Sequence, residues 1–246
     1  MKNLILKDLL PGWLHEFAGL VSEGQFHEGT IADGQNGNGQ GSADKDSNVV
    51  AFECKIAFSN EYELQENLIC FLRYKLASAG LACNYTVDKE VKIDFAFNDP
   101  NFKAQCGKEI IDVVIFKGLC IKKTEEKYAI ELKYPHKKAY PFMMYSCVKD
   151  IAFMEEAQDL WNTGVVNPFD GSYCLTFVDD HLFYSGEIPG PIYSHFRPVG
   201  GTTAPIHGTI PRPNKGCGMP LQLNISGSYM INWLPCGKYH YYLVVI

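Results

Sequence analysis

Two segments of the chain place ionisable residues inside otherwise apolar stretches. Asp112 lies within the run IIDVVI, and Glu131 and Lys133 lie within KYAIELKY. A charge in a buried segment is costly unless it is paired or bound to a metal. Two carboxylates beside one ammonium group suit the binding of Mg²⁺ together with a phosphate. These residue types therefore indicate a site that could bind Mg²⁺ and a phosphate.

The two segments read as neighbouring strands of a sheet. Residues 109–117 form a nearly continuous β-branched run, which is typical of a strand buried on both faces, and residues 127–134 predict a second strand. Because side chains alternate along a strand, Glu131 and Lys133 project from the same face. If the two strands pair as a hairpin, Asp112 approaches Glu131.

A helix is predicted before these strands, over residues 60–79, NEYELQENLICFLRYKLASA. Ser59 or Asn60 is placed to cap its start, and Gly80 follows its last apolar position. Its apolar face consists of Leu64, Leu68, Phe71, Leu72 and Leu76.

Two polar residues share the apolar face of this helix. At ~100° per residue, Glu61 and Gln65 fall within the apolar sector, whereas Glu63 and Glu66 point away from it. An inward-facing acid at the start of a helix has two interpretations: Glu61 adds an acid to the metal site, with Gln65 beside it, or it caps an exposed helix end.

Together these features resemble the PD-(D/E)XK nuclease superfamily, which has the restriction-endonuclease-like fold. The family pattern is an acidic residue on one core strand, followed on the next strand by Glu or Asp, any residue, and Lys. Asp112 and the triplet Glu131-Leu132-Lys133 match this pattern, with Ile111 where the motif's name has proline. The resemblance covers roughly residues 60–178, and it implies an α/β fold with a central mixed β-sheet flanked by helices.

The resemblance also implies an activity, the metal-dependent hydrolysis of phosphodiester bonds, in DNA rather than RNA. Asp112 and Glu131 would bind Mg²⁺, or Mn²⁺ in its place, and Glu61 would bind the metal directly or through water. Lys133 would orient the attacking water and offset charge in the transition state. A homodimer would suit cleavage of a palindromic site.

Candidate nucleic-acid-binding residues surround this motif. Clustered cations attract phosphates without sequence selectivity. The alternative for the basic residues is a solvated turn or helix face, and the formal net charge of −6 disfavours a protein that only binds nucleic acid. The candidates are Gln65, His136, Lys137, Lys138 and Lys149.

The remaining chain predicts one main domain with appendages. We expect an N-terminal helical segment at 1–27, with an amphipathic helix over 9–21, and a flexible Gly/Asn-rich loop at 28–48. Residues 49–246 would form a single α/β domain with a long irregular excursion at about 186–238. Further elements are expected as strands at 83–88, 91–97, 173–178 and 239–246, and as a helix at 142–162.

Cysteine usage and hydropathy indicate a cytoplasmic protein. The nine cysteines include no CxxC pair, and several lie in apolar runs, as expected for reduced, buried residues. The alternative is a zinc site formed by Cys217 and Cys236 with His207 or His240. The N-terminus does not resemble a signal peptide, and no segment approaches the ~20 apolar residues of a membrane span.

Two other classes of function stay open from the sequence. One is a catalytically inactive nucleic-acid-binding or assembly protein on the same fold, which the intact acidic and basic motif residues disfavour. The other is a hydrolase with a cysteine nucleophile, for which no cysteine has a local signature.

Overall fold

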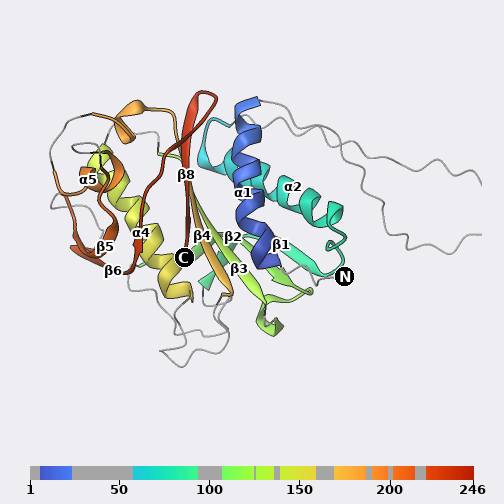
Figure 1. Ribbon diagram of the computed structural model, residues 1–246. Coiled ribbons are helices and arrows are strands. Elements are labelled where there is room, and N and C mark those ends of the chain that lie inside the picture. The colour runs from blue at the N-terminus through green and yellow to red at the C-terminus, as the bar shows by residue number, and fades with distance from the viewer. Residues whose placement is uncertain are drawn as a thin grey trace, which may run out of the picture.

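The computed structural model describes residues 6–23, 58–93, 107–124, 126–135, 139–158, 169–186, 190–198, 202–213 and 220–246. A six-stranded sheet in the order β1-β2-β3-β4-β8-β7 lies at the centre. Helices α1 (Leu6–Glu23) and α2 (Glu61–Ser78) cover one face, and α4 (Tyr140–Gln158) covers the other (Figure 1). The predicted α/β class, a central mixed sheet flanked by helices, is confirmed.

The topology of the sheet places both strands of the predicted hairpin inside the sheet, away from its edges. β2 and β3 pair antiparallel, as predicted, and β3 pairs parallel with β4 after a crossover through α4. Residues 85–92, from the expected strands at 83–88 and 91–97, form one strand, β1, and residues 94–97 lie outside the described residues. The strands are β1 (Tyr85–Lys92), β2 (Ile110–Lys117), β3 (Lys127–Lys133), β4 (Gly171–Val178), β7 (Leu234–Cys236) and β8 (Tyr239–Val245).

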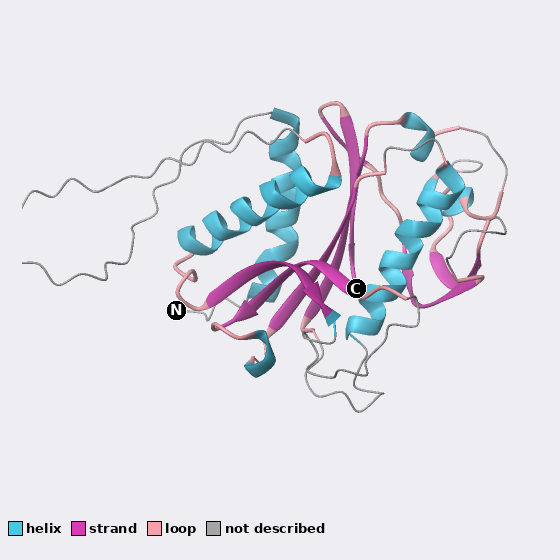
Figure 2. Ribbon diagram, turned by 180° about the vertical axis from the view of Figure 1, so that it is seen from behind, coloured by secondary structure: helices cyan, strands magenta, loops and turns pink. Residues whose placement is uncertain are grey.

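Hydrophobic clusters on both faces of the sheet explain why its central strands read as continuous apolar runs. Figure 2 shows the sheet from the side, with helices packed on each of its two faces. Alternate residues of β3 divide between the layers, with Ile130 packing on the side of α1 and α2 and Ala129 on the side of α4. In α1, which contains the amphipathic helix expected over 9–21, the apolar face is buried and includes Leu10, Trp13, Leu14, Phe17 and Val21. The loop expected at 28–48 lies outside the described residues.

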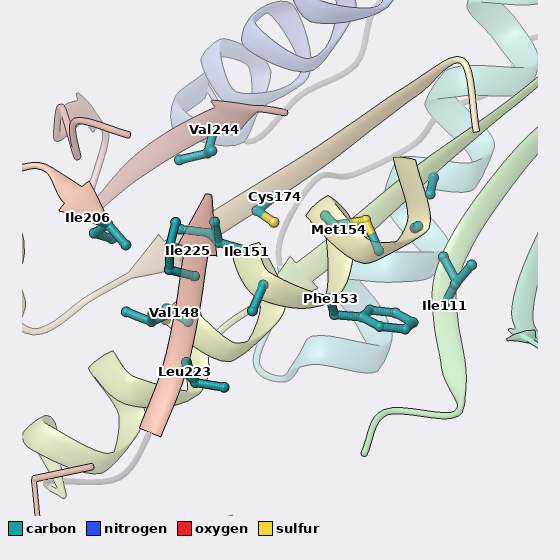
Figure 3. Close-up of a cluster of buried hydrophobic side chains, with 14 of the residues drawn as sticks. Ile111, Val148, Ile151, Phe153, Met154, Cys174, Ile206, Leu223, Ile225 and Val244 are labelled. Atoms are coloured by element: carbon teal, nitrogen blue, oxygen red, sulfur yellow. The ribbon is translucent and has the colours of Figure 1, made fainter. Parts of the chain in front are cut away.

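The segment predicted as an irregular excursion contributes to the core. Its strands β5 (Ile206–Pro211) and β6 (Gln222–Tyr229) pair antiparallel as a separate two-stranded sheet. Their inward residues Ile206, Leu223 and Ile225 are buried beside α4 (Figure 3). These residues therefore form regular and partly buried strands within the segment expected to be irregular. The described residues also form short helical turns at η1 (Ile121–Lys123), η3 (His181–Phe183) and α5 (Tyr193–Phe196).

Asn60 caps α2, the helix that carries Glu61. Its Oδ1 accepts a hydrogen bond from Glu63 N at 2.9 Å, and the Glu63 carboxylate accepts one from Ser59 N at 2.7 Å. Because capping satisfies backbone N–H groups that have no partner within the helix, Asn60→Ala should lower the free energy of unfolding by about 1 kcal/mol. Urea unfolding measures the change. Asn60→Asp keeps the acceptor and should stay near wild type, and equal losses in both variants would contradict the capping role.

Candidate active site

Regular pairing between β2 and β3 ends at Asp112. The register pairs Val113 with Ile130, which places Asp112 across from Glu131, the first position beyond the ladder. At this position the Asp112 side chain, not its backbone, bonds to β3, since its Oδ2 accepts a hydrogen bond from Leu132 N at 2.8 Å. The sheet therefore opens between β2 and β3 where the predicted motif residues lie.

The pairing between β1 and β2 is interrupted at the same level. It skips Glu90, which lies across from Asp112 and has a φ of 51°, rare for a residue with a side chain. Ile111 packs beneath α4 whereas Val113 packs beneath α2, although alternate residues of a regular strand share a face. An irregularity of this kind redirects a side chain, here that of Asp112.

Gln65 bridges this interruption from α2. Its side chain is buried, and its Nε2 donates to the Asp112 backbone oxygen at 2.7 Å and to Glu90 Oε1 at 2.9 Å. The predicted inward orientation of Gln65 is confirmed. The contacts make it a positioning residue for Asp112, and its predicted contact with nucleic acid stays a prediction.

Glu61 joins the first turn of α2 to the end of β3. Its Oε2 accepts a hydrogen bond from Tyr134 N at 2.9 Å, and its Oε1 lies 3.7 Å from Lys133 Nζ. Glu61 therefore faces the motif as predicted, and Asn60, not Glu61, caps the helix. A pocket of about 210 Å³ lies beside it, lined by Glu61, Tyr62, Gln65, Glu90, Asp112 and Leu132.

Two further charged residues, Lys108 and Asp150, contact the motif residues on the face of the sheet covered by α4. Glu131 is only 1% exposed, and its Oε2 accepts a hydrogen bond from the ammonium group of Lys108. The same ammonium lies 2.8 Å from Oδ1 of Asp150 on α4, and Lys133 Nζ lies 3.6 Å from the other Asp150 oxygen. Sequence reasoning did not select Lys108 or Asp150 as site residues.

The charges of the site shift one another's pKa values in opposite directions. Burial and the nearby Asp112 charge raise the pKa of Glu131 well above its usual range, against the attraction of Lys108. Burial also raises the pKa of Asp112 to about 6, opposed by Lys108 and by the Leu132 N–H. Burial acts on Asp150 too, but Lys108 and Lys133 together outweigh it and lower the pKa of Asp150. Opposed shifts among adjacent carboxylates are a feature of functional sites.

Two carboxylate oxygens in this cluster need a further partner. Glu131 Oε1 and Asp150 Oδ2 are buried and have no hydrogen-bond donor among the described residues. Burying a carboxylate oxygen without a hydrogen-bond partner costs free energy, and a bound cation can take the place of that partner. No group of three or more His, Cys, Asp or Glu side chains suited to a metal is found in the described part of the chain. The donors fit the usual Mg²⁺ arrangement, in which one or two carboxylates act together with water and substrate phosphate.

The remaining candidates are the basic residues predicted to bind phosphate and the cysteines of the alternative zinc site. Lys149 is half-buried on α4, and its charge helps to lower the pKa of Asp150. The predicted phosphate-binding residues His136, Lys137 and Lys138 lie outside the described residues. So does Cys217 of the alternative zinc site, whose Cys236 is buried, with a pKa raised by burial to about 12.

Comparisons of the chain with protein-family models, curated proteins and solved structures gave no match. Across the described ranges, no helix has the length and apolar character needed to cross a membrane.

Proposed function

We propose that this protein is a metal-dependent nuclease that hydrolyses phosphodiester bonds, in DNA rather than RNA, as its resemblance to the PD-(D/E)XK superfamily implies. The observation that carries the proposal is the carboxylate of Glu131. Its Oε1 is buried without a hydrogen-bond donor in the described structure, at the point where the neighbouring strand supplies Asp112. A divalent cation is the partner that such an oxygen fits.

Each residue of the site has a role in this proposal. Asp112 and Glu131 would hold Mg²⁺ or Mn²⁺, with Glu61 contributing directly or through water. When bound, the metal polarises the phosphate and lowers the pKa of a bound water. Lys133 is held between Glu61 and Asp150, at 3.7 Å and 3.6 Å, so its ammonium is fixed at the end of β3. From there it would orient the water and offset charge in the transition state.

The compartment proposed for this activity is the cytoplasm. Six cysteines among the described residues are free, and three of them, Cys147, Cys174 and Cys236, are buried. Free, buried thiols fit a reducing compartment.

Cleavage assays on the full chain test the nuclease proposal. Supercoiled plasmid, linear duplex and single-stranded DNA are each incubated with Mg²⁺, with Mn²⁺ or with a chelator. We expect cleavage only with metal, and nicking of the plasmid would identify an endonuclease. Because Lys133 acts on the transition state, Lys133→Met should cleave about 10²–10³-fold more slowly. It should still bind Mn²⁺.

Lys117→Met is the matched control for Lys133→Met. Lys117 ends β2, is mostly exposed, and pairs with Glu126 at 3.3 Å, away from the site. Its replacement should leave the cleavage rate unchanged. Equal rates in wild type and Lys133→Met would assign the activity to a contaminant or another site and would overturn the proposal.

One observation favours a second candidate, a catalytically inactive nucleic-acid-binding or assembly protein on the same fold. The ammonium of Lys108 already lies between Glu131 and Asp150, so the network carries a counter-charge without a metal. DNA binding by the wild type, with neither Mn²⁺ binding nor cleavage, would select this candidate over the nuclease.

A further inference from the structure

Lys108 occupies a central position among the acids of the site without belonging to a strand or helix. It follows Gly107, whose φ is 73°, and precedes the first residue of β2 by two positions. Its side chain is 18% exposed, and its ammonium bonds to Glu131 Oε2 and to Asp150 Oδ1. One ammonium therefore bridges two carboxylates, one from the sheet and one from α4.

This bridge leaves the acidic cluster incompletely neutralised. Lys108 reaches one oxygen of each carboxylate, and the other oxygens, Glu131 Oε1 and Asp150 Oδ2, lack a hydrogen-bond donor within the described chain. Lys133 Nζ lies 3.6 Å from Asp150 Oδ2, which is too far for a hydrogen bond. Four carboxylates, with Asp112 and Glu61 beside Glu131 and Asp150, face three ammonium groups, those of Lys108, Lys133 and Lys149, and a divalent ion would supply the additional charge.

We propose that Lys108 is a placeholder cation: it neutralises Glu131 and Asp150 in the metal-free protein, and a divalent ion binds by displacing its ammonium from Glu131. The inference rests on the proposed nuclease function, which requires that metal. An ammonium bonded to one oxygen of a carboxylate repels a divalent ion approaching the other, because the two cations would lie only a few ångströms apart. Metal binding and the Lys108–Glu131 contact therefore compete.

The surroundings of Lys108 allow this displacement. Its ammonium ends a flexible four-carbon stem, and the residue makes no strand-pairing contact with the residues that the structure describes. Withdrawal of the side chain would therefore leave β2 and β3 intact. Asp150, released from the same ammonium, would become an additional acid facing the metal, beyond the motif that the sequence shows.

A lysine that serves only as a permanent structural partner would behave in the opposite way. Its removal would weaken the arrangement of Glu131 and Asp150, so metal affinity would fall. A placeholder lysine instead opposes the metal, so that its removal tightens metal binding while it destabilises the metal-free protein. The sign of the change in affinity distinguishes the two roles.

Mn²⁺ binding by the full chain, measured by calorimetry without DNA, tests the proposal in Lys108→Met. Loss of a charged hydrogen bond that competes with the metal should lower the Kd for Mn²⁺ by about tenfold or more. The melting temperature should be lower than wild type without Mn²⁺ and should rise further than wild type when Mn²⁺ is added. Lys117→Met should match wild type in both measurements.

Lys108→Gln provides a second neutral variant if Lys108→Met does not fold. An unchanged or higher Kd in a folded neutral variant, with wild type binding Mn²⁺ and cleaving DNA, would overturn the placeholder role and leave the nuclease proposal standing. Absence of Mn²⁺ binding from wild type and variants alike would remove the nuclease proposal and this inference together.

Discussion

Glu131→Gln is expected to lose Mn²⁺ binding and DNA cleavage together, while the metal-free protein remains at least as stable as wild type at pH 7. The loss of function follows because glutamine keeps the shape of the side chain but removes the charge that holds a metal. A purely structural role for Glu131 would predict the reverse, namely a clear loss of stability.

The expected stability follows from the balance of charges around Glu131. Removing one partner of a buried ion pair usually costs about 3–5 kcal/mol because the other charge is left uncompensated. Here Lys108 keeps Asp150 as a partner at 2.8 Å, so its charge is not isolated. Burial raises the pKa of Glu131 well above its usual value, which means that the ionised carboxylate opposes folding even with Lys108 beside it. A neutral side chain removes that opposition.

Calorimetric titration with Mn²⁺, plasmid cleavage and urea unfolding, made on the same preparation, test this expectation. Glu126→Gln is the control, since Glu126 lies at the opposite end of β3 and interacts with Tyr85, Tyr128 and Lys117. It should keep metal binding and cleavage. Cleavage at the wild-type rate by folded Glu131→Gln would exclude Glu131 from the site.

The elements that place the site could be predicted because their signals are local. The β-branched run around Asp112 indicates a strand buried on both faces, residues 127–134 indicate a second strand, and both lie inside the sheet rather than at its edges. In α2, the helical period alone places Glu61 and Gln65 on the inward face, and both contact the strands. Gly80, with a φ of 71°, follows the end of α2 at the position expected from sequence.

Lys108 and Asp150 could not be predicted because their positions depend on contacts between distant segments. α4 packs against the sheet on one side and against the β5–β6 hairpin on another, so most of its residues are buried and no single apolar face stands out. The inward direction of Asp150 is therefore hidden in the sequence. Lys108 precedes its strand, where neither the helical period nor strand alternation applies.

The hairpin beside α4 escaped prediction for a similar reason. Ile206 and Ile210 alternate with exposed residues in β5, but Gly208 and Pro211 interrupt the pattern and are themselves typical of turns. Gly208 has a φ of 70°, and the register between the strands shifts beside it. The strand signal is therefore shorter than the window in which alternation can be recognised.

Asp112→Asn is expected to raise the stability of the metal-free protein in a pH-dependent way. Burial raises the pKa of Asp112 from its usual 3.8 to about 6, although Lys108 and the Leu132 N–H favour the charged form. Between about pH 4 and pH 6 the folded protein therefore holds this proton while the unfolded chain has lost it. The contribution of Asp112 to stability consequently falls as the pH rises through that window, and stays at its low level above it.

Asparagine does not ionise, so the variant avoids this loss. A pKa difference of about two units corresponds to about 3 kcal/mol, which is the gain expected for Asp112→Asn over wild type at pH 8. At pH 3 Asp112 is protonated in both the folded and unfolded states, and the two proteins should be equally stable. Urea unfolding of both proteins from pH 3 to pH 8 measures the difference.

Asp88→Asn, an exposed position on β1, serves as the control and should follow the wild-type curve. A difference between Asp112→Asn and wild type that is constant with pH, or that grows toward acid, would show that the Asp112 charge does not oppose folding. Adding Mn²⁺ at pH 8 should stabilise wild type more than Asp112→Asn, because the ionised carboxylate is the form that binds a metal. The charge that lowers stability in the metal-free protein is thus the charge that the proposed nuclease needs.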